Sequence, residues 1–199
     1  MKQSEHFING EGEAWLKRNK AKLPVKNDPV IEALKQHPEI QPGGIVEVGA
    51  ANGWRLSILR EHYNCSAEGI DPGASLTEWS KSGVYRGTAD NLRFPDNDFD
   101  LVIYGFCLYL CDREDLFKIV AEGDRVLKDG GYLMIYDFAA APHSKEYHHK
   151  PGILSYKMDY AHLWLGNPAY TLVARHYFPE ATSVAILKKD IANAWPLRK

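Results

Sequence analysis

Two acidic residues and a loop of small residues have the types and the spacing needed to bind a nucleotide. Glu47 lies two residues before the loop Gly49–Gly53, and Asp71 follows that loop by 18 residues. Glycines let the backbone turn sharply and approach a ligand closely. A carboxylate at this distance from the loop is expected to accept hydrogen bonds from both ribose hydroxyls. Asp71 has a second interpretation, as the N-cap of a helix predicted over Ala74–Ser80.

Local patterns predict the strand, loop and helix that would position these residues. Ile45–Val48 is a short apolar run after Pro42-Gly43-Gly44, which is typical of a buried parallel strand that follows a turn. Trp54–Tyr63 has leucines and an isoleucine at helical spacing. Ser66–Ile70 predicts the next strand. Strand, tight loop and helix form the first unit of a nucleotide-binding α/β fold, although the dinucleotide fingerprint G-x-G-x-x-G is absent.

The loop resembles a motif of a known family. Glu47-x-Gly49-x-Ala51-x-Gly53 is similar to motif I of the class I S-adenosyl-L-methionine (SAM)-dependent methyltransferases, in which an acidic residue precedes G-x-G-x-G. Ala51 stands where the family usually has its middle glycine. Gly69-Ile70-Asp71-Pro72 looks like motif II of the same family.

Two further segments extend this resemblance. Residues 85–102 resemble the family segment G-D-A-E-x-L-P-F-P-D-x-x-F-D-x-V, and this long match is the most specific in the chain. Leu127–Leu133 matches the family pattern L-K-x-G-G-x-L. The resemblance covers residues 41–137 strongly and 169–190 weakly.

The resemblance implies an α/β fold: a Rossmann-like, doubly wound sheet of seven strands, mostly parallel, with an antiparallel C-terminal hairpin and helices on both faces. The sequence patterns agree with strands over 98–104 and 132–136, an amphipathic helix over 112–127 and two β runs over 169–178 and 181–190. Gly130 and Gly131 are expected to end that helix. We expect one domain over residues 1–199.

By the same resemblance the cofactor is SAM, with S-adenosyl-L-homocysteine (SAH) as its product. The expected cofactor-binding residues of the core are Glu47, Gly49, Ala50, Ala51, Asn52, Gly53, Asp71, Pro72, Ala89, Asp90, Gly105 and Phe106. Thr88 stands where the family often has an aspartate that binds the adenine amino group. Either Asp90 accepts a hydrogen bond from the adenine amino group instead, or Asp90 is a solvent-exposed acidic residue of a turn. The Ala89 N–H is expected to donate to adenine N1.

Residues 1–40 are predicted to be a helical segment before the cofactor-binding core of residues 41–138. Helices are expected over Glu13–Ala21 and Pro29–Gln36, with Asp28-Pro29 at the start of the second. Trp15, Arg18 and Asn19 resemble a W-x-x-R-N stretch of some small methyltransferases that modify sugars or natural products. This resemblance implies a lid that covers the cofactor; a helical pair packed on the sheet is the alternative.

Aromatic and histidine side chains are frequent in residues 139–168, the predicted substrate region that precedes the closing hairpin of residues 169–190. Such side chains at the mouth of a crevice suit a polar organic substrate. Whether residues 155–160 form a strand or a helix stays open. Candidates for a general base are His143, His148, His149, Asp137 and Tyr109, although each alone is more often structural.

Composition narrows the class of function. The 199 residues carry a net charge of −2, which gives no electrostatic case for binding nucleic acid. Three cysteines favour a reducing cytosol, and no apolar run approaches the length of a membrane span. No metal is expected, because neither H-E-x-x-H nor paired cysteines at metal-binding spacing occur.

The leading interpretation is a cytoplasmic methyltransferase, a monomer or homodimer, that acts on an O or N atom of a small polar molecule such as a sugar, a nucleotide sugar or a secondary metabolite. Two other classes stay open. One is an NAD-dependent oxidoreductase on a similar fold, and the other is a non-catalytic module that binds SAM.

Overall fold

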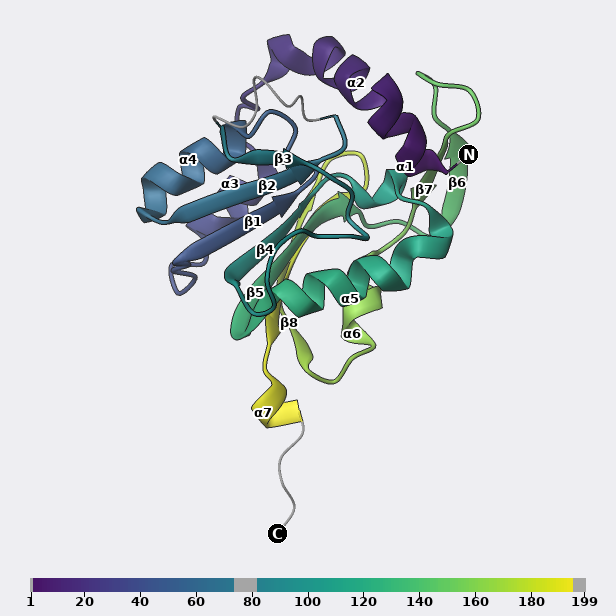
Figure 1. Ribbon diagram of the computed structural model, residues 1–199. Coiled ribbons are helices and arrows are strands. Elements are labelled where there is room, and N and C mark those ends of the chain that lie inside the picture. Colours follow the sequence, from purple (N-terminus) through teal and green to yellow (C-terminus); the bar gives the residue numbers. More distant parts are fainter. Residues whose placement is uncertain (1, 74–81, 195–199) are drawn as a thin grey trace.

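A twisted sheet of seven strands forms the centre of the protein (Figure 1). The computed structural model describes residues 2–73 and 82–194; the helix expected over 74–80 lies outside them. The strands are β1 (Gly44–Val48), β2 (Ser66–Asp71), β3 (Val84–Arg86), β4 (Phe99–Gly105), β5 (Leu127–Phe138), β8 (Tyr170–Phe178) and β9 (Thr182–Lys189). The main helices are α1 (Gln3–His6), α2 (Gly12–Asn19), α3 (Pro29–Lys35), α4 (Trp54–Tyr63), α5 (Leu116–Val126), α6 (Ala161–Leu165) and α7 (Ile191–Ala194).

The strand order is β3-β2-β1-β4-β5-β9-β8. The first five strands are parallel, and β9 pairs antiparallel with both β5 and β8. The order reverses between β1 and β4. In open α/β sheets such a reversal lies beside a ligand crevice at the carboxyl ends of the strands. The expected fold class is therefore confirmed, including the antiparallel C-terminal hairpin.

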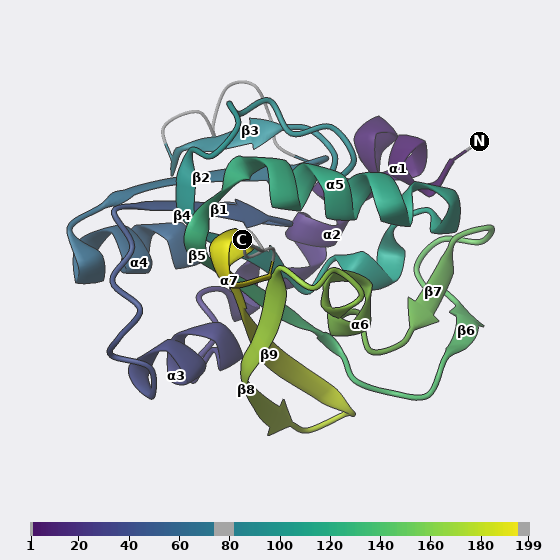
Figure 2. The same ribbon diagram turned by 90° about the horizontal axis from the view of Figure 1, so that it is seen from below.

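Helices cover both faces of the sheet (Figures 1 and 2). On one face α3 and α4 pack on Ile45 and Leu101 through buried aliphatic side chains. On the other face α5 and α6 pack on Val46 and Val102. Neighbouring residues of β1 thus point to opposite faces, and both faces are apolar, as expected of a buried parallel strand.

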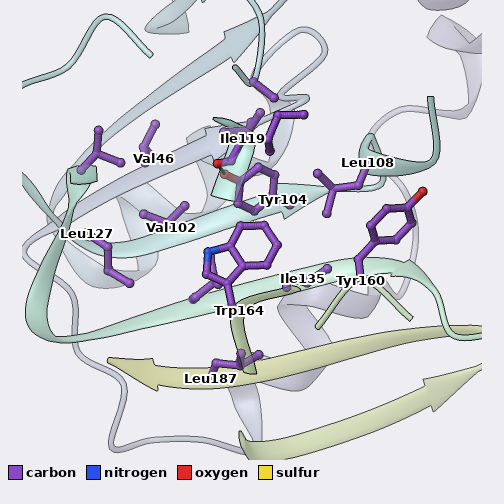
Figure 3. Packing of buried hydrophobic residues seen from close by; sticks show 14 of the residues in the cluster. Val46, Val102, Tyr104, Leu108, Ile119, Leu127, Ile135, Tyr160, Trp164 and Leu187 are labelled. Atoms are coloured by element: carbon purple, nitrogen blue, oxygen red, sulfur yellow. Dashed lines mark hydrogen bonds between the residues drawn. The ribbon is translucent and has the colours of Figure 1, made fainter. Parts of the chain in front are cut away.

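Aromatic side chains anchor the second face. Figure 3 shows Tyr104 of β4 beside Trp164 of α6, and their ring centroids are 5.1 Å apart. The Tyr104 hydroxyl donates to the carbonyl oxygen of Ile119 at 3.1 Å, so its polar atom is satisfied in the core. This contact ties α5 to the strand that ends at the crevice.

The expected end of the helix before β5 is wrong in one respect. Helix α5 ends at Val126, and Leu127 already pairs with Phe99 in the sheet. The register shifts before Leu101 pairs with Tyr132, so Gly130, at φ 80°, lies in a bulge of the strand. Leu127 is fully buried in an extended conformation, which explains why the chain enters the sheet before it reaches the glycines.

The segment after β5 forms a small hairpin, β6 (His143–Glu146) and β7 (Leu154–Lys157), followed by α6. Residues 155–160 are thus partly strand and partly the turn into a helix. In the described part of the chain, no helix has the length and apolar character required to cross a membrane.

Candidate active site

A cavity of about 270 Å³ lies at the carboxyl ends of the parallel strands. Its wall is built from the segments that follow β1, β2, β3 and β4, from Tyr136 of β5, and from residues of the N-terminal segment. Fewer than half of the side chains that line it are charged, and aromatic rings are frequent. Such a mixture suits an organic ligand with a few polar groups.

The loop after β1 turns with three residues in the left-handed region: Gly49, Ala51 and Gly53. Gly49 has φ 78°, and a Cβ atom there would lie 2.6 Å from Cys107 Cβ, so only glycine fits. Ala51 has φ 49°. An alanine tolerates this conformation at a cost of roughly 1–2 kcal/mol. The loop geometry is therefore kept although Ala51 replaces the usual glycine.

Asp71 at the end of β2 braces that loop. Its Oδ2 accepts the backbone N–H of Ala51 at 2.9 Å, and Oδ1 accepts that of Gly73 at 2.8 Å. Burial raises the pKa of Asp71 to about 6, and the two backbone donors oppose the rise. Each carboxylate oxygen keeps a lone pair for a ligand at the cavity wall.

Glu47 is buried at the floor of the cavity, beside Gly105. Its Oε1 accepts a hydrogen bond from Arg55, whereas Oε2 is buried and has no hydrogen-bond partner among the residues that the structure describes. Burial raises the pKa of Glu47 to about 7, while Arg55 opposes this shift. A buried acceptor without a donor is costly. A ligand with a donor or a cationic group therefore fits this end of the cavity.

The segment after β3 supplies the other end. Gly87, Thr88, Ala89 and Asp90 all line the cavity. Asp90 lies 3.2 Å from the Lys118 ammonium, and Thr88 and Lys118 lower the pKa of Asp90 against the effect of burial. The carboxylate is thus ionised and can still accept a further donor.

Aromatic rings follow β4. Phe106 adopts φ 63° and stacks on Tyr136 with a centroid distance of 4.9 Å. Tyr109 packs against Phe106 at the same distance. All three rings line the cavity together with Gly105. A non-glycine residue in the left-handed region is strained, and such strain is concentrated at functional sites.

The N-terminal segment forms part of the cavity wall. It comprises α1, the wide turn η1 (Phe7–Glu11) and α2, and it contributes Phe7 and Trp15 to the wall. Gly12 lies against Gly73; a Cβ on Gly12 would come within 2.5 Å of the Gly73 Cα. Figure 1 shows this segment running across the end of the sheet toward β6 and β7.

Trp15 thus reaches the cavity, but Arg18 and Asn19 do not line it. Arg18 donates to Glu11 and, at 3.3 Å, to the hydroxyl of Tyr147. The Asn19 side chain donates to the carbonyl oxygen of Trp15 at 2.8 Å. Both residues fix the N-terminal segment, and their assignment to cofactor binding stays a prediction.

The predicted cofactor-binding residues of the core are brought together with two exceptions. Asn52 and Gly53 belong to the loop but are not part of the cavity wall. Gly53, with φ 75°, begins α4, and the side chain of Asn52 accepts the N–H of Trp54 at 3.4 Å. The other ten line the wall: Glu47, Gly49, Ala50, Ala51, Asp71, Pro72, Ala89, Asp90, Gly105 and Phe106.

Of the five base candidates, Tyr109 alone lines the cavity. The Asp137 carboxylate is buried and accepts the backbone N–H groups of Leu108 and Tyr109 at 2.9 and 3.3 Å. Exposed positions on or beside the hairpin β6–β7 hold His143, His148 and His149. Within the described ranges, no group of three or more His, Cys, Asp or Glu side chains is arranged to hold a metal ion.

Sequence reasoning missed Asp28 and Arg55, which also line the cavity. Asp28 does cap α3, accepting the Ile31 N–H at 3.1 Å, as the sequence predicted. It also binds Arg55. The available signal was Arg55 itself, because it shares a helix face with Leu59 four residues later, and a cation on an apolar face needs a buried partner.

Comparisons with known proteins agree with this site. Residues 46–135 match the family model described as a methyltransferase domain. The chain therefore carries a methyltransferase domain over residues 46–135. Its fold is that of SAM-dependent methyltransferases, and SAM is the cofactor that such a domain uses.

Solved structures show the same fold at low sequence identity. Burkholderia thailandensis 1,6-didemethyltoxoflavin-N1-methyltransferase, with bound 1,6-didemethyltoxoflavin and SAH, superposes with a TM-score of 0.73 at 16% identity, covering 94% of this chain and 87% of its own. A chain from the Haloferax volcanii complex between the Trm112 methyltransferase activator and a putative methyltransferase gives 0.68 at 15% identity, covering 92% and 97%. A Mesorhizobium loti SAM-dependent methyltransferase gives 0.60 at 14% identity, covering 79% and 96%. No curated protein matches the sequence.

Proposed function

We propose that this methyltransferase transfers the methyl group of SAM to an N or O atom of a small polar organic molecule that enters beside Trp15 and Tyr109. The observation that carries the proposal is one cavity that joins the loop after β1, Asp71 and the aromatic rings after β4. The first solved structure described above holds a small-molecule acceptor. We also propose a cytosolic location, supported by the free thiols of all three cysteines.

The chain's own residues would bind the cofactor along the ends of the strands. Asp71 would hold the ribose hydroxyls, the Ala89 N–H and Asp90 the adenine, and Glu47 the methionine ammonium. The bound cofactor supplies an electrophilic methyl group on a sulfonium. The protein then has to orient the acceptor in line with that methyl group and exclude water. Phe7 and Trp15 serve this by closing the cavity.

A base is needed only where the acceptor atom arrives protonated. Tyr109 is placed to contact an acceptor, and burial together with Asp137 raises the pKa of Tyr109 above its usual range, so the hydroxyl acts as a hydrogen-bond donor. Asp137 supports the turn that carries Tyr109 through its backbone N–H. We therefore propose Tyr109 as an orienting group, with an amine or an already acidic hydroxyl as the acceptor.

Calorimetry with SAM, SAH and NADH tests the first half of this proposal. We expect one molecule of SAM or SAH per chain and no binding of NADH. The absence of SAM and SAH binding at millimolar concentration would overturn the proposal, and NADH binding would favour an oxidoreductase. A screen of amines, phenols and sugars with labelled SAM then identifies the acceptor.

A further inference from the structure

A buried arginine is held between two buried carboxylates at the floor of the cavity. Arg55 donates through Nε and Nη2 to the two oxygens of Asp28, at 2.9 and 2.8 Å. Its Nη1 donates to Oε1 of Glu47. The side chains are 7%, 1% and 1% exposed for Arg55, Asp28 and Glu47. With both carboxylates ionised the triad has a net charge of −1, so it is not electrically neutral by itself.

The backbone around the triad makes room for it. A Cβ atom on Gly105 would overlap Glu47 and lie 2.9 Å from Arg55 Nη1. On the other side the Arg55 guanidinium carbon lies 4.8 Å from the centre of the Trp54 ring. Gly105 and Trp54 both line the cavity. The pair of Arg55 and Glu47 is therefore enclosed between the end of β4 and the start of α4, and its geometry is set from both sides.

This arrangement makes the two oxygens of Glu47 unlike. Oε1 is occupied by Arg55, whereas Oε2 is buried and, within residues 2–73 and 82–194, has no hydrogen-bond partner. A free glutamate side chain would exchange its two oxygens by rotation about its last bond. Arg55 cannot follow such a rotation, because its other two donors are bound to Asp28. The fixed guanidinium thus decides which oxygen is left for a ligand.

We propose that Arg55, anchored by Asp28, is a positioning residue that holds Glu47 in one orientation and reserves Oε2 for the ammonium group of the cofactor's methionine part. The inference rests on the proposed contact between Glu47 and the cofactor. It assigns a function to Asp28, which lies before the core that matches the methyltransferase domain. A cationic group at Oε2 would also neutralise the net negative charge of the triad.

Several ionisable groups face Glu47 from the surrounding elements. Arg55 comes from α4, Asp28 precedes α3, Asp71 ends β2, and Cys107 comes from the segment after β4. Tyr136 of β5 faces the other two members of the triad, Asp28 and Arg55. Asp28 and Asp71 disfavour the ionised form of Glu47, and Arg55 favours it. Loss of Arg55 therefore leaves Glu47 protonated at neutral pH, in a form that binds an ammonium poorly.

The test compares two ligands that differ in the group concerned. SAH carries the amino acid part, whereas 5′-methylthioadenosine keeps the adenosine and the thioether without it. Arg55→Lys keeps the positive charge but cannot reach both carboxylates as a planar fork. We expect this variant to bind SAH about tenfold more weakly, the effect of losing one charge-assisted hydrogen bond. Its affinity for methylthioadenosine should equal that of the wild type.

Matched variants exclude a general effect on folding. Arg60→Lys lies on the same helix, where Arg60 donates to the carbonyl oxygens of Ala67 and Ser82 away from the cavity, and it should bind both ligands normally. Asp28→Asn retains an N-cap for α3 but weakens the anchor of Arg55. This variant should therefore also bind SAH more weakly while its affinity for methylthioadenosine is unchanged. The double variant Glu47→Gln with Arg55→Lys should lose no more affinity for SAH than Glu47→Gln alone, because both substitutions act on one contact.

The pH dependence gives a readout that a purely structural role would not change. Wild-type affinity for SAH, relative to methylthioadenosine, should rise through about pH 7 as Glu47 ionises. Taking the ratio removes the contribution of Asp71, which both ligands share. In Arg55→Met the midpoint should move to higher pH. Equal loss of both ligands in Arg55→Lys, or no loss of either, would overturn the proposal. If the wild type binds neither ligand, the proposed function fails instead.

Discussion

At the residue scale, two carboxylates near the carboxyl ends of the parallel strands β1 and β2 have different surroundings. Asp71 is half-buried and uses both oxygens to brace the loop and the turn beside it. Glu47 is fully buried, and in the described part of the chain its carboxylate accepts a hydrogen bond from Arg55 alone. The first is arranged to accept from neutral hydroxyls, the second to accept from a cation. This division matches a ligand that has a ribose at one point and an ammonium at another.

Asp71→Ala should weaken SAH binding by about tenfold or more. The change removes charge-assisted hydrogen bonds worth roughly 1.5–3 kcal/mol. Calorimetry on the purified variant measures it, with Asp71→Asn as the control, because asparagine keeps an acceptor for the Ala51 N–H but loses the charge. Unchanged affinity with a lower melting temperature would show that Asp71 only caps the following turn.

Asp137→Asn should flatten the dependence of stability on pH. Burial raises the pKa of Asp137 to about 7 from 3.8, so the folded protein binds a proton that the unfolded chain releases. The stability that Asp137 contributes is present below about pH 4 and is lost as pH rises through about 7. The amide does not titrate.

From pH 4 to pH 8, the free energy of unfolding of the asparagine variant should therefore increase relative to that of the wild type. One pKa unit corresponds to about 1.4 kcal/mol, so we expect a relative change of about 2 kcal/mol or more. Urea denaturation at the two pH values measures it. Parallel pH curves for the two proteins would contradict this account of Asp137.

At the element scale, the loop after β4 fastens the N-terminal segment over the cavity. The Asp112 carboxylate accepts the N–H groups of Gln3 and Ser4 at 2.7 and 3.0 Å, so it caps α1 from a distant part of the chain. The Gln3 side chain then bridges to Leu110 and Leu154. These hydrogen bonds join the N-terminal segment to the loop after β4 and to the start of β7.

Asp112→Ala should loosen this segment without unfolding the sheet. Loss of an N-cap costs about 1 kcal/mol, so hydrogen exchange at residues 3–11 should become faster and SAH should dissociate more quickly. Glu114→Ala is the matched control, because Glu114 makes an exposed ion pair with Lys2 and such pairs contribute little. Identical exchange in both variants would argue against the cap.

The elements differ in how far the sequence predicted them. The sequence patterns of Glu47–Gly53 and of residues 85–102 predicted the core of the fold, because each pattern consists of residues that are close together in the sequence. The partners of Arg55 and of Arg18 were not predictable, since Asp28 and Tyr147 come from other parts of the chain. The role of the histidine-rich segment in substrate binding stays a prediction. The exposed positions of its histidines depend on the hairpin β6–β7, which the sequence did not predict.

At the scale of the whole molecule, the N-terminal segment contacts the segment after β5. Phe7 of the N-terminal segment packs with Tyr147 and Ile153 of the segment after β5. The Gln3 side chain accepts the N–H of Leu154 at 2.6 Å. Two segments that are far apart in the sequence therefore lie side by side. Whether they form the acceptor pocket stays a prediction.

Deleting residues 1–22 should abolish turnover while the sheet still folds. The deletion removes Phe7 and Trp15 from the cavity wall and opens the methyl group to water. The sheet keeps its two cores, since the buried residues of both hydrophobic clusters lie between Val30 and Leu187. Methyl transfer from labelled SAM, circular dichroism and SAH binding measure the three properties separately.

The expected pattern is a cooperative thermal transition, weakened SAH binding and no product. A substitution inside the intact segment is the control: Trp15→Ala should lower turnover while the contact of Gly12 with Gly73 is kept. A truncated protein with full activity would show that the segment only covers the sheet. A truncated chain without a cooperative transition would instead show that the segment is part of the core, because a lid can be removed without loss of the fold.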